Sequence, residues 1–178
     1  MKFVKLLLPL AALFWIGVKL VNYYEVEDHN VVITESNHVI DIANRMIKVP
    51  EGLEASINVA LDPANAAMKA ETRLFFLENE EGRLAKAADA IQQDLDTYVF
   101  MEGDPVKAQA FRVAVSKMIN VYRDQSDDYD AIVASIMANP SDQQALRQEV
   151  EAALYLLAVE QQVAVEEVTA AQYTFLKS

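Results

Sequence analysis

The chain has 178 residues, no cysteine and a formal net charge of −12, with 27 acidic residues against 15 Lys plus Arg. The lack of cysteine excludes disulfides and thiolate metal sites. The acidic balance argues against nucleic acid as a partner, because phosphate binding needs clustered Lys and Arg.

The first 24 residues differ from all the rest. Residues 3–21 are apolar apart from two Lys, one Pro and one Gly, and every acidic residue of the chain follows residue 24. At a rise of about 1.5 Å per residue, such a run approaches the roughly 30 Å of a bilayer core. Lys5 and Lys19 lie near its ends, where a long amine can reach the headgroups. We therefore expect residues 1–24 to form a retained membrane anchor that contacts the membrane through residues 3–21.

A cleaved secretory signal is the main alternative for this run. Lys2 and Lys5 supply a basic start, but no small-x-small cleavage site follows Val18. Tyr23 and Tyr24 instead suit the aromatic belt of a spanning helix. A buried or peripheral apolar helix is a further alternative, since the run is near the short limit for spanning.

Charge predicts the orientation of the anchor. Residues 1–24 carry +3 and residues 25–178 carry −15. Lys2, Lys5 and the terminal amine precede the apolar run, so the positive-inside rule keeps the N-terminus in the cytoplasm. The prediction is a single-pass protein of the inner (cytoplasmic) membrane with a periplasmic or otherwise extracytoplasmic body.

Three Asp-Pro or Asn-Pro pairs predict helix starts in the body. Asp or Asn caps the first free backbone N–H groups, and proline fits the next position, where its missing N–H has no partner. The pairs are Asp62–Pro63, Asp104–Pro105 and Asn139–Pro140, with Ser141–Asp142 as an alternative cap for the last.

Apolar residues follow two of these starts at alternating three- and four-residue spacing, which predicts one buried helix face. The first series is Ala67, Ala70, Leu74, Leu77, Glu81, Leu84, Ala88, Ile91, Leu95 and Tyr98. The second series is Ala108, Phe111, Val115, Met118, Tyr122, Gln125, Tyr129, Ile132 and Ile136. We expect helices of about 35 residues from Pro63 and from Pro105, the first continuing through Gly82 at a cost of about 1 kcal/mol. A kink at Gly82 or within the polar stretch Asp124–Asp130 is the alternative.

Two further segments complete the expected fold. Residues 141–176 are apolar around most of the helix, which predicts the central helix of a bundle. Residues 25–49 form a less regular helix, with Val31–Thr34 as an alternative strand, and Leu53–Leu61 a short connecting helix.

The fold class is therefore all-α: an N-terminal transmembrane helix followed by an antiparallel bundle of three to four long helices. The expected parts are the anchor at 1–24, a juxtamembrane helix with its connecting helix at 25–62, and the bundle at 63–178. An array of helical repeats is a weaker alternative, because only the caps recur.

The sequence nominates no catalytic, cofactor-binding or metal-binding residue. The chain has two histidines, His29 and His38. Glu35 and His38 have the spacing of half a di-iron motif, which needs two copies, so a solvated polar face is favoured. The cluster Asp124–Asp130 fails the calcium-loop pattern at its sixth and twelfth positions, and is better explained as a solvated bulge or the acidic first turn of a helix from Ser126.

Two groups of side chains have competing explanations. Glu81 falls on an apolar face, so a perturbed pKa there is one interpretation and an edge position the favoured one. Seven aromatic residues are expected to pack mostly in the core: Phe75, Phe76, Tyr98, Phe100, Phe111, Tyr122 and Tyr129.

The leading functional hypothesis is a non-enzymatic tethered module. It would scaffold, assemble or regulate an envelope complex by helix-face packing, with a protein partner or as a homo-oligomer, and residues 25–49 would be the interacting helix. A sensory or small-ligand-binding bundle is the alternative. A hydrolase with two carboxylates is the third hypothesis.

Overall fold

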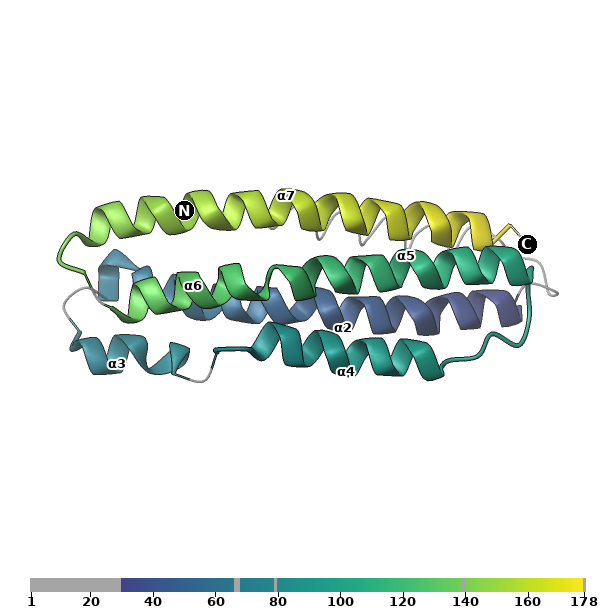
Figure 1. Ribbon diagram of the computed structural model, residues 1–178, viewed down its shortest axis with the longest axis horizontal. Coiled ribbons are helices and arrows are strands. Elements are labelled where there is room, and N and C mark those ends of the chain that lie inside the picture. The colour runs from purple at the N-terminus through teal and green to yellow at the C-terminus, as the bar shows by residue number, and fades with distance from the viewer. Residues whose placement is uncertain (1–29, 66–67, 79, 139, 178) are drawn as a thin grey trace.

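The computed structural model describes residues 30–65, 68–78, 80–138 and 140–177 of the chain, and their regular structure is entirely helical (Figure 1). The all-α prediction is confirmed. The alternative strand at Val31–Thr34 is wrong, because these residues lie inside a helix. The predicted anchor at 1–24 lies outside the described residues, and no helix within the described ranges is both long enough and apolar enough to cross a bilayer.

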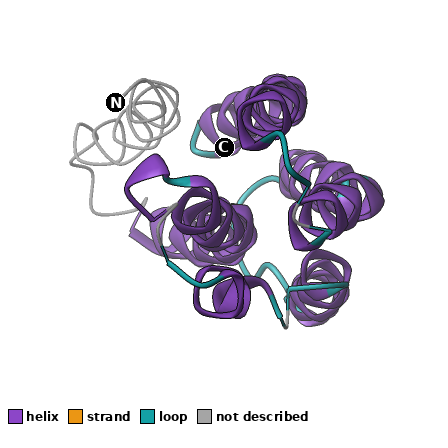
Figure 2. Ribbon diagram, turned by 90° about the vertical axis from the view of Figure 1, so that its left-hand side faces the viewer, coloured by secondary structure: helices purple, strands orange, loops and turns teal. Residues whose placement is uncertain are grey.

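The long helices run antiparallel along one axis, so an elongated bundle forms (Figures 1 and 2). Its helices are α2 (Asn30–Leu61), α3 (Ala70–Leu74), α4 (Arg83–Thr97), α5 (Pro105–Asp124), α6 (Ser126–Met137) and α7 (Gln143–Phe175), with short 3₁₀ turns η2 (Pro63–Asn65) and η3 (Phe75–Leu77). The predicted antiparallel bundle is therefore confirmed for the described residues.

Helix α2 is longer than the sequence indicated. It contains Pro50 and continues to Leu61, so the separate connecting helix expected at Leu53–Leu61 is the second half of α2. Val39, Met46, Leu53 and Ile57 on α2 are each almost fully buried and belong to the same core as residues of α4 to α7. Residues 30–61 are thus a packed layer of the bundle.

The single long helix predicted from Pro63 is wrong. Asp62 caps only the 3₁₀ turn η2, where its carboxylate accepts the Ala64 N–H at 2.9 Å. Gly82 adopts a left-handed conformation with φ of 66°, which starts α4 anew. Its N–H donates to both carboxylate oxygens of Asp130 on α6, at 3.0 and 3.1 Å. Glycine takes this φ without a Cβ penalty, and the chain turns here instead of continuing as a helix.

Residues of the first apolar series are nevertheless buried both before and after the interruption. The members that are buried lie on both sides of Gly82: Leu74, Leu77, Leu84, Ala88, Ile91 and Leu95. The three- and four-residue spacing predicted correctly which side chains point into the core, on both sides of Gly82. It did not predict the continuity of the backbone.

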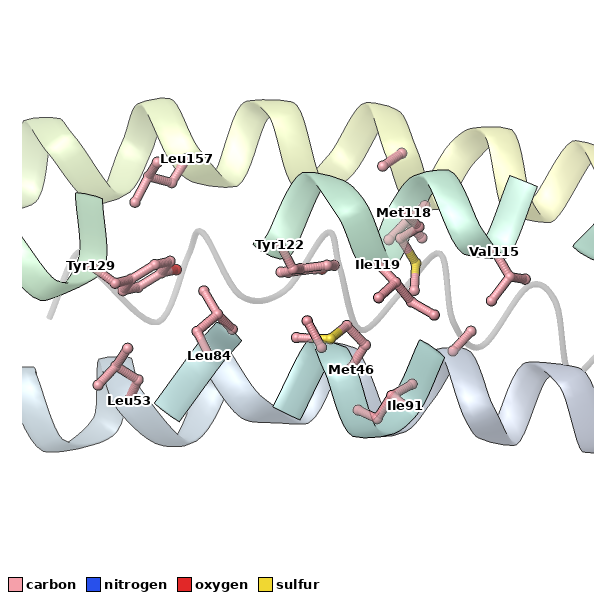
Figure 3. Close-up of a cluster of buried hydrophobic side chains, with 14 of the residues drawn as sticks. Met46, Leu53, Leu84, Ile91, Val115, Met118, Ile119, Tyr122, Tyr129 and Leu157 are labelled. Atoms are coloured by element: carbon pink, nitrogen blue, oxygen red, sulfur yellow. The ribbon is translucent and has the colours of Figure 1, made fainter. Parts of the chain in front are cut away.

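The segment from Pro105 matches its prediction more closely. Asp104 caps α5 by accepting the N–H groups of Val106 and Lys107 at 2.8 and 3.3 Å. Gln125 separates α5 from α6, but the i→i−4 pattern continues through it, with the Gln125 N–H to Val121 O and the Tyr129 N–H to Gln125 O both at 3.1 Å. All nine residues of the predicted series are buried, and several meet α2 and α4 in the core (Figure 3).

Helix α7 begins after the alternative cap. The Asp142 carboxylate accepts the Ala145 N–H at 2.9 Å, so the helix starts at Gln143. The prediction that this helix is central is wrong. It packs mainly against α5 and lies along one side of the bundle in Figures 1 and 2, and much of its broad apolar face is exposed.

Candidate docking surface on α7

A row of apolar side chains runs along the outside of α7. Leu156, Val159 and Val163 are 66%, 44% and 54% exposed, and Ala152 extends the row by one turn. Their spacing of four, three and four residues places them on one stripe of the helix. We call these four residues the outer row.

Two open grooves border the outer row. The first, of about 480 Å³, lies between α6 and α7, and the second, of about 560 Å³, lies between α5 and α7. Leu156 lines the first groove, and Val159 and Val163 line the second. The outer row and the two grooves therefore make one long surface with an apolar row along it, which we call the docking surface.

Acidic side chains surround this surface. Among the described residues, those lining the grooves include five carboxylates and one ammonium group: Asp124, Asp128, Glu149, Glu160, Glu167 and Lys117. The salt bridges within the described part of the chain join Arg45 to Asp94, Arg83 to Glu80, Arg123 to Asp89 and Arg147 to Glu151. None of these bridges uses a groove carboxylate, so the docking surface has a negative field that these bridges leave intact.

Glu160 lines both grooves and connects the docking surface to the interior. Its carboxylate accepts a hydrogen bond from Gln125 Nε2 at 2.9 Å. Gln125 Oε1 accepts from Gln161 Nε2 at 2.8 Å, and Gln161 Nε2 also lies 3.2 Å from the Tyr129 hydroxyl. Tyr129 in turn donates to Glu54 on α2 at 3.0 Å. A polar chain thus crosses the bundle from α7 to α2, and each buried amide in it has partners.

Burial along this chain changes two acid–base equilibria. Desolvation raises the pKa of the Glu54 carboxyl above its usual range, although the hydrogen bond from Tyr129 opposes the shift. Desolvation also raises the pKa of Tyr129, with the Glu54 carboxylate adding to the effect. The Tyr129 hydroxyl is therefore a protonated donor at neutral pH.

The half-motif Glu35–His38 is resolved by the structure. Glu35 is buried, and its carboxylate accepts the N–H groups of Met101 at 2.5 Å and Glu102 at 3.3 Å, which holds the loop between α4 and α5. The expectation of a solvated face is therefore wrong for Glu35. His38 is exposed and stacks on Tyr98, with ring centroids 4.6 Å apart. His29 lies outside the described residues.

The other acidic candidates also have assignments. Asp127 and Asp128 occupy the first turn of α6, which starts at Ser126 as one of the two interpretations predicted. Glu81 is exposed and so is not a buried carboxylate of the apolar face, whereas the neighbouring Glu80 is buried and pairs with Arg83 at 2.8 Å. No three His, Asp or Glu side chains of the described residues gather as a metal site.

The aromatic residues divide into three groups. Phe111, Tyr122 and Tyr129 are in the core as expected, and Tyr98 and Phe100 are partly buried against it. Phe75 and Phe76 are 63% and 53% exposed, so the core prediction is wrong for them. They lie in η3, a 3₁₀ turn with about 3.0 residues per turn, whereas the prediction assumed the roughly 3.6 residues per turn of an α-helix.

Sequence reasoning missed the buried amides that join the helices. Gln161 and Gln172 on α7 are 3% and 5% exposed, and Gln172 Nε2 donates to the Ser36 hydroxyl on α2 at 3.1 Å. A signal was present, since Gln125 occupies a core position of the second series and a buried amide needs a polar partner. The partner lies 36 residues away on α7, beyond the reach of local spacing.

Comparison with protein-family models, curated proteins and solved structures finds no match to this chain.

Proposed function

We propose that this protein is a membrane-tethered, extracytoplasmic helical module that scaffolds, assembles or regulates an envelope protein complex through helix-face packing. The exposed outer row of α7 carries this proposal. Leu156, Val159 and Val163 form an exposed apolar stripe that borders two grooves, which follow one another along α7 and meet at Glu160. Contiguous exposed apolar surface of this kind is typical of protein–protein contact, and a helix laid into such a groove is a recurrent mode of recognition.

The docking surface is placed on α7, and no longer on residues 25–49. The described part of that segment turns Val39, Ile42 and Met46 into the core against its neighbours. By contrast, Leu156, Val159 and Val163 of the outer row are exposed among the described residues. The open shape of the two grooves also favours a helix-binding role over the sensory bundle, which would need an enclosed cavity.

Residues 3–21 supply the tether in this proposal. A chain held at the membrane searches two dimensions, so its effective concentration near a membrane partner rises. The mature protein is then expected to begin at Met1 and to stay with membranes after a high-salt wash. A mature N-terminus near residue 20–25 would show that the segment is a cleaved signal.

Site-specific photo-crosslinking in intact cells tests the docking role. A crosslinking amino acid at Val159, 44% exposed on α7, is compared with one at Val59, 39% exposed on α2. The expected result is one discrete adduct from Val159 and none from Val59. The same adducts from both positions, or none from Val159, would contradict the proposal.

A further inference from the structure

We infer that the occupant of the docking surface is an amphipathic helix of another protein, with Lys or Arg beside its apolar row. This inference rests on the proposed function and specifies the chemistry of the partner. The grooves have five carboxylates and one Lys along their walls. A helix carrying cations beside its apolar residues would place them against these carboxylates.

The size of the surface specifies the length of the helix. The groove residues on α7 extend from Glu149 to Glu167. At about 1.5 Å per residue this stretch is about 27 Å long, so a partner helix of about 18 residues covers it. Its apolar residues would need spacing of three and four to meet Leu156, Val159 and Val163.

Charge argues against a second copy as the occupant. Symmetric pairing of two docking surfaces would bring Glu149, Glu160 and Glu167 of each copy toward the same acids of the other. Like charges facing one another at a desolvated contact are unfavourable. The chain's own residues 1–24 carry +3 and are apolar, but in the proposed function they are occupied by lipid.

Glu160 is the expected specificity contact. It is the acid common to both grooves, and in the free protein its partner is the neutral amide of Gln125. A partner guanidinium or ammonium at this point would form a charge-assisted bond, which is stronger than the bond to a neutral amide. The partner's central cation is therefore expected to lie opposite the middle of α7.

The test measures binding of three designed 18-residue peptides to the full-length chain in nanodiscs of zwitterionic lipid. The first peptide is a helix with Leu at positions a and d and Lys at e and g, the second carries Glu instead of Lys, and the third has the first composition in scrambled order. The Lys helix is expected to bind at least tenfold more tightly than the other two, with affinity falling as salt is added. Empty nanodiscs control for binding to lipid.

Two matched triple variants locate the binding. Asp124→Asn, Glu149→Gln and Glu167→Gln together remove three groove charges and should weaken binding of the Lys helix at least tenfold. The same charge change away from the grooves, at Asp41, Glu71 and Glu81, should leave the affinity within twofold. All six side chains are exposed, so folding is expected to survive in both variants.

Each other outcome overturns the inference. Equal binding of the Lys and Glu helices, or no binding by any peptide, would exclude a basic amphipathic partner. Dimers in sedimentation that block the Lys helix would assign the surface to a second copy. Tighter peptide binding after Lys2→Gln, Lys5→Gln and Lys19→Gln would assign it to the chain's own N-terminal segment. If in-cell adducts form at Val159 while the peptides fail to discriminate, the proposed function stands and only the partner chemistry is wrong.

Discussion

The inner and outer faces of α7 have similar composition but opposite surroundings. The inner face buries Leu154, Leu157 and Val168 in the bundle core, whereas the outer row leaves Leu156 and Val163 more than half exposed. The core also contains polar groups, such as Gln161, while the outer row contains none. Apolar breadth around a helix therefore does not place that helix at the centre of a fold, and here it marks surface that the described part of the chain leaves exposed.

The largest expected effect is a difference in the free energy of unfolding between a substitution on the inner face of α7 and one on its outer row. Leu154→Asp puts an unpaired carboxylate into the core and should lower the free energy of unfolding by about 3 kcal/mol or more. Leu156→Asp, two residues away on the outer row, should change it by less than about 0.5 kcal/mol. Urea unfolding of the two variants measures the difference. Equal destabilisation would mean that the outer row is also part of the core.

The next effect concerns the polar chain of the inner face. Gln161→Ala removes the donor to Gln125 Oε1 and to the Tyr129 hydroxyl, so the buried Gln125 Oε1 loses this partner while Tyr129 keeps its bond to Glu54. A loss of about 1–3 kcal/mol is expected. Gln162→Ala is the matched control, because the Gln162 side chain donates to the exposed Glu166 at 3.0 Å, and its loss should cost under about 0.5 kcal/mol. If thermal or urea unfolding shows no difference between Gln161→Ala and Gln162→Ala, the polar chain does not stabilise the fold.

A smaller effect is expected at Gly82, where the helix predicted from Pro63 is interrupted and α4 begins. A Cβ at Gly82 would meet nothing closer than the Lys86 side chain at 3.8 Å, so Gly82→Ala adds no clash. The left-handed φ of 66° should still cost about 1–2 kcal/mol. Gly82→Asn should recover part of this loss, since Asn tolerates the conformation. If Ala and Asn are equally stable at this site by urea unfolding, backbone strain does not explain the break.

The smallest effect is a change in pH dependence at the far end of the polar chain. Burial raises the pKa of Glu54 above its ordinary value of 4.5, so the folded protein holds this proton to higher pH than the unfolded chain. The free energy of unfolding contributed by Glu54 therefore falls as pH rises from the unfolded pKa through the folded pKa, and stays reduced above it.

Glu54→Gln removes the pH-dependent contribution of Glu54 to the free energy of unfolding and keeps an acceptor for Tyr129. The variant is expected to gain stability relative to the parent as pH rises from 3.5 to 7, and to show no gain at the acid end. Urea midpoints at intervals across this range measure the difference. A constant difference at all pH values would contradict the assignment of the titration to Glu54.

Much of the fold could be predicted from spacing and caps. The Asp104 cap, the nine buried residues of the second series and the start near Ser126 are all local features, and each is found. The break at Gly82 was missed because spacing does not report a left-handed φ, and because the Asp130 carboxylate that accepts the Gly82 N–H comes from 48 residues away. The exposed side of α7 was missed for a related reason: spacing identifies an apolar face, but only the count and placement of neighbouring helices decide whether that face is covered.

We propose that another protein covers the outer row of α7 in the cell. The chain has no cysteine, so single-cysteine variants give a clean measurement of accessibility. Leu156→Cys and Val59→Cys are labelled with a membrane-impermeant maleimide, first in intact cells with a permeable outer envelope and then in the purified full-length chain. The account predicts that position 156 is protected in cells and reactive after purification, while position 59 reacts in both. Equal and rapid labelling of position 156 in both settings would contradict it.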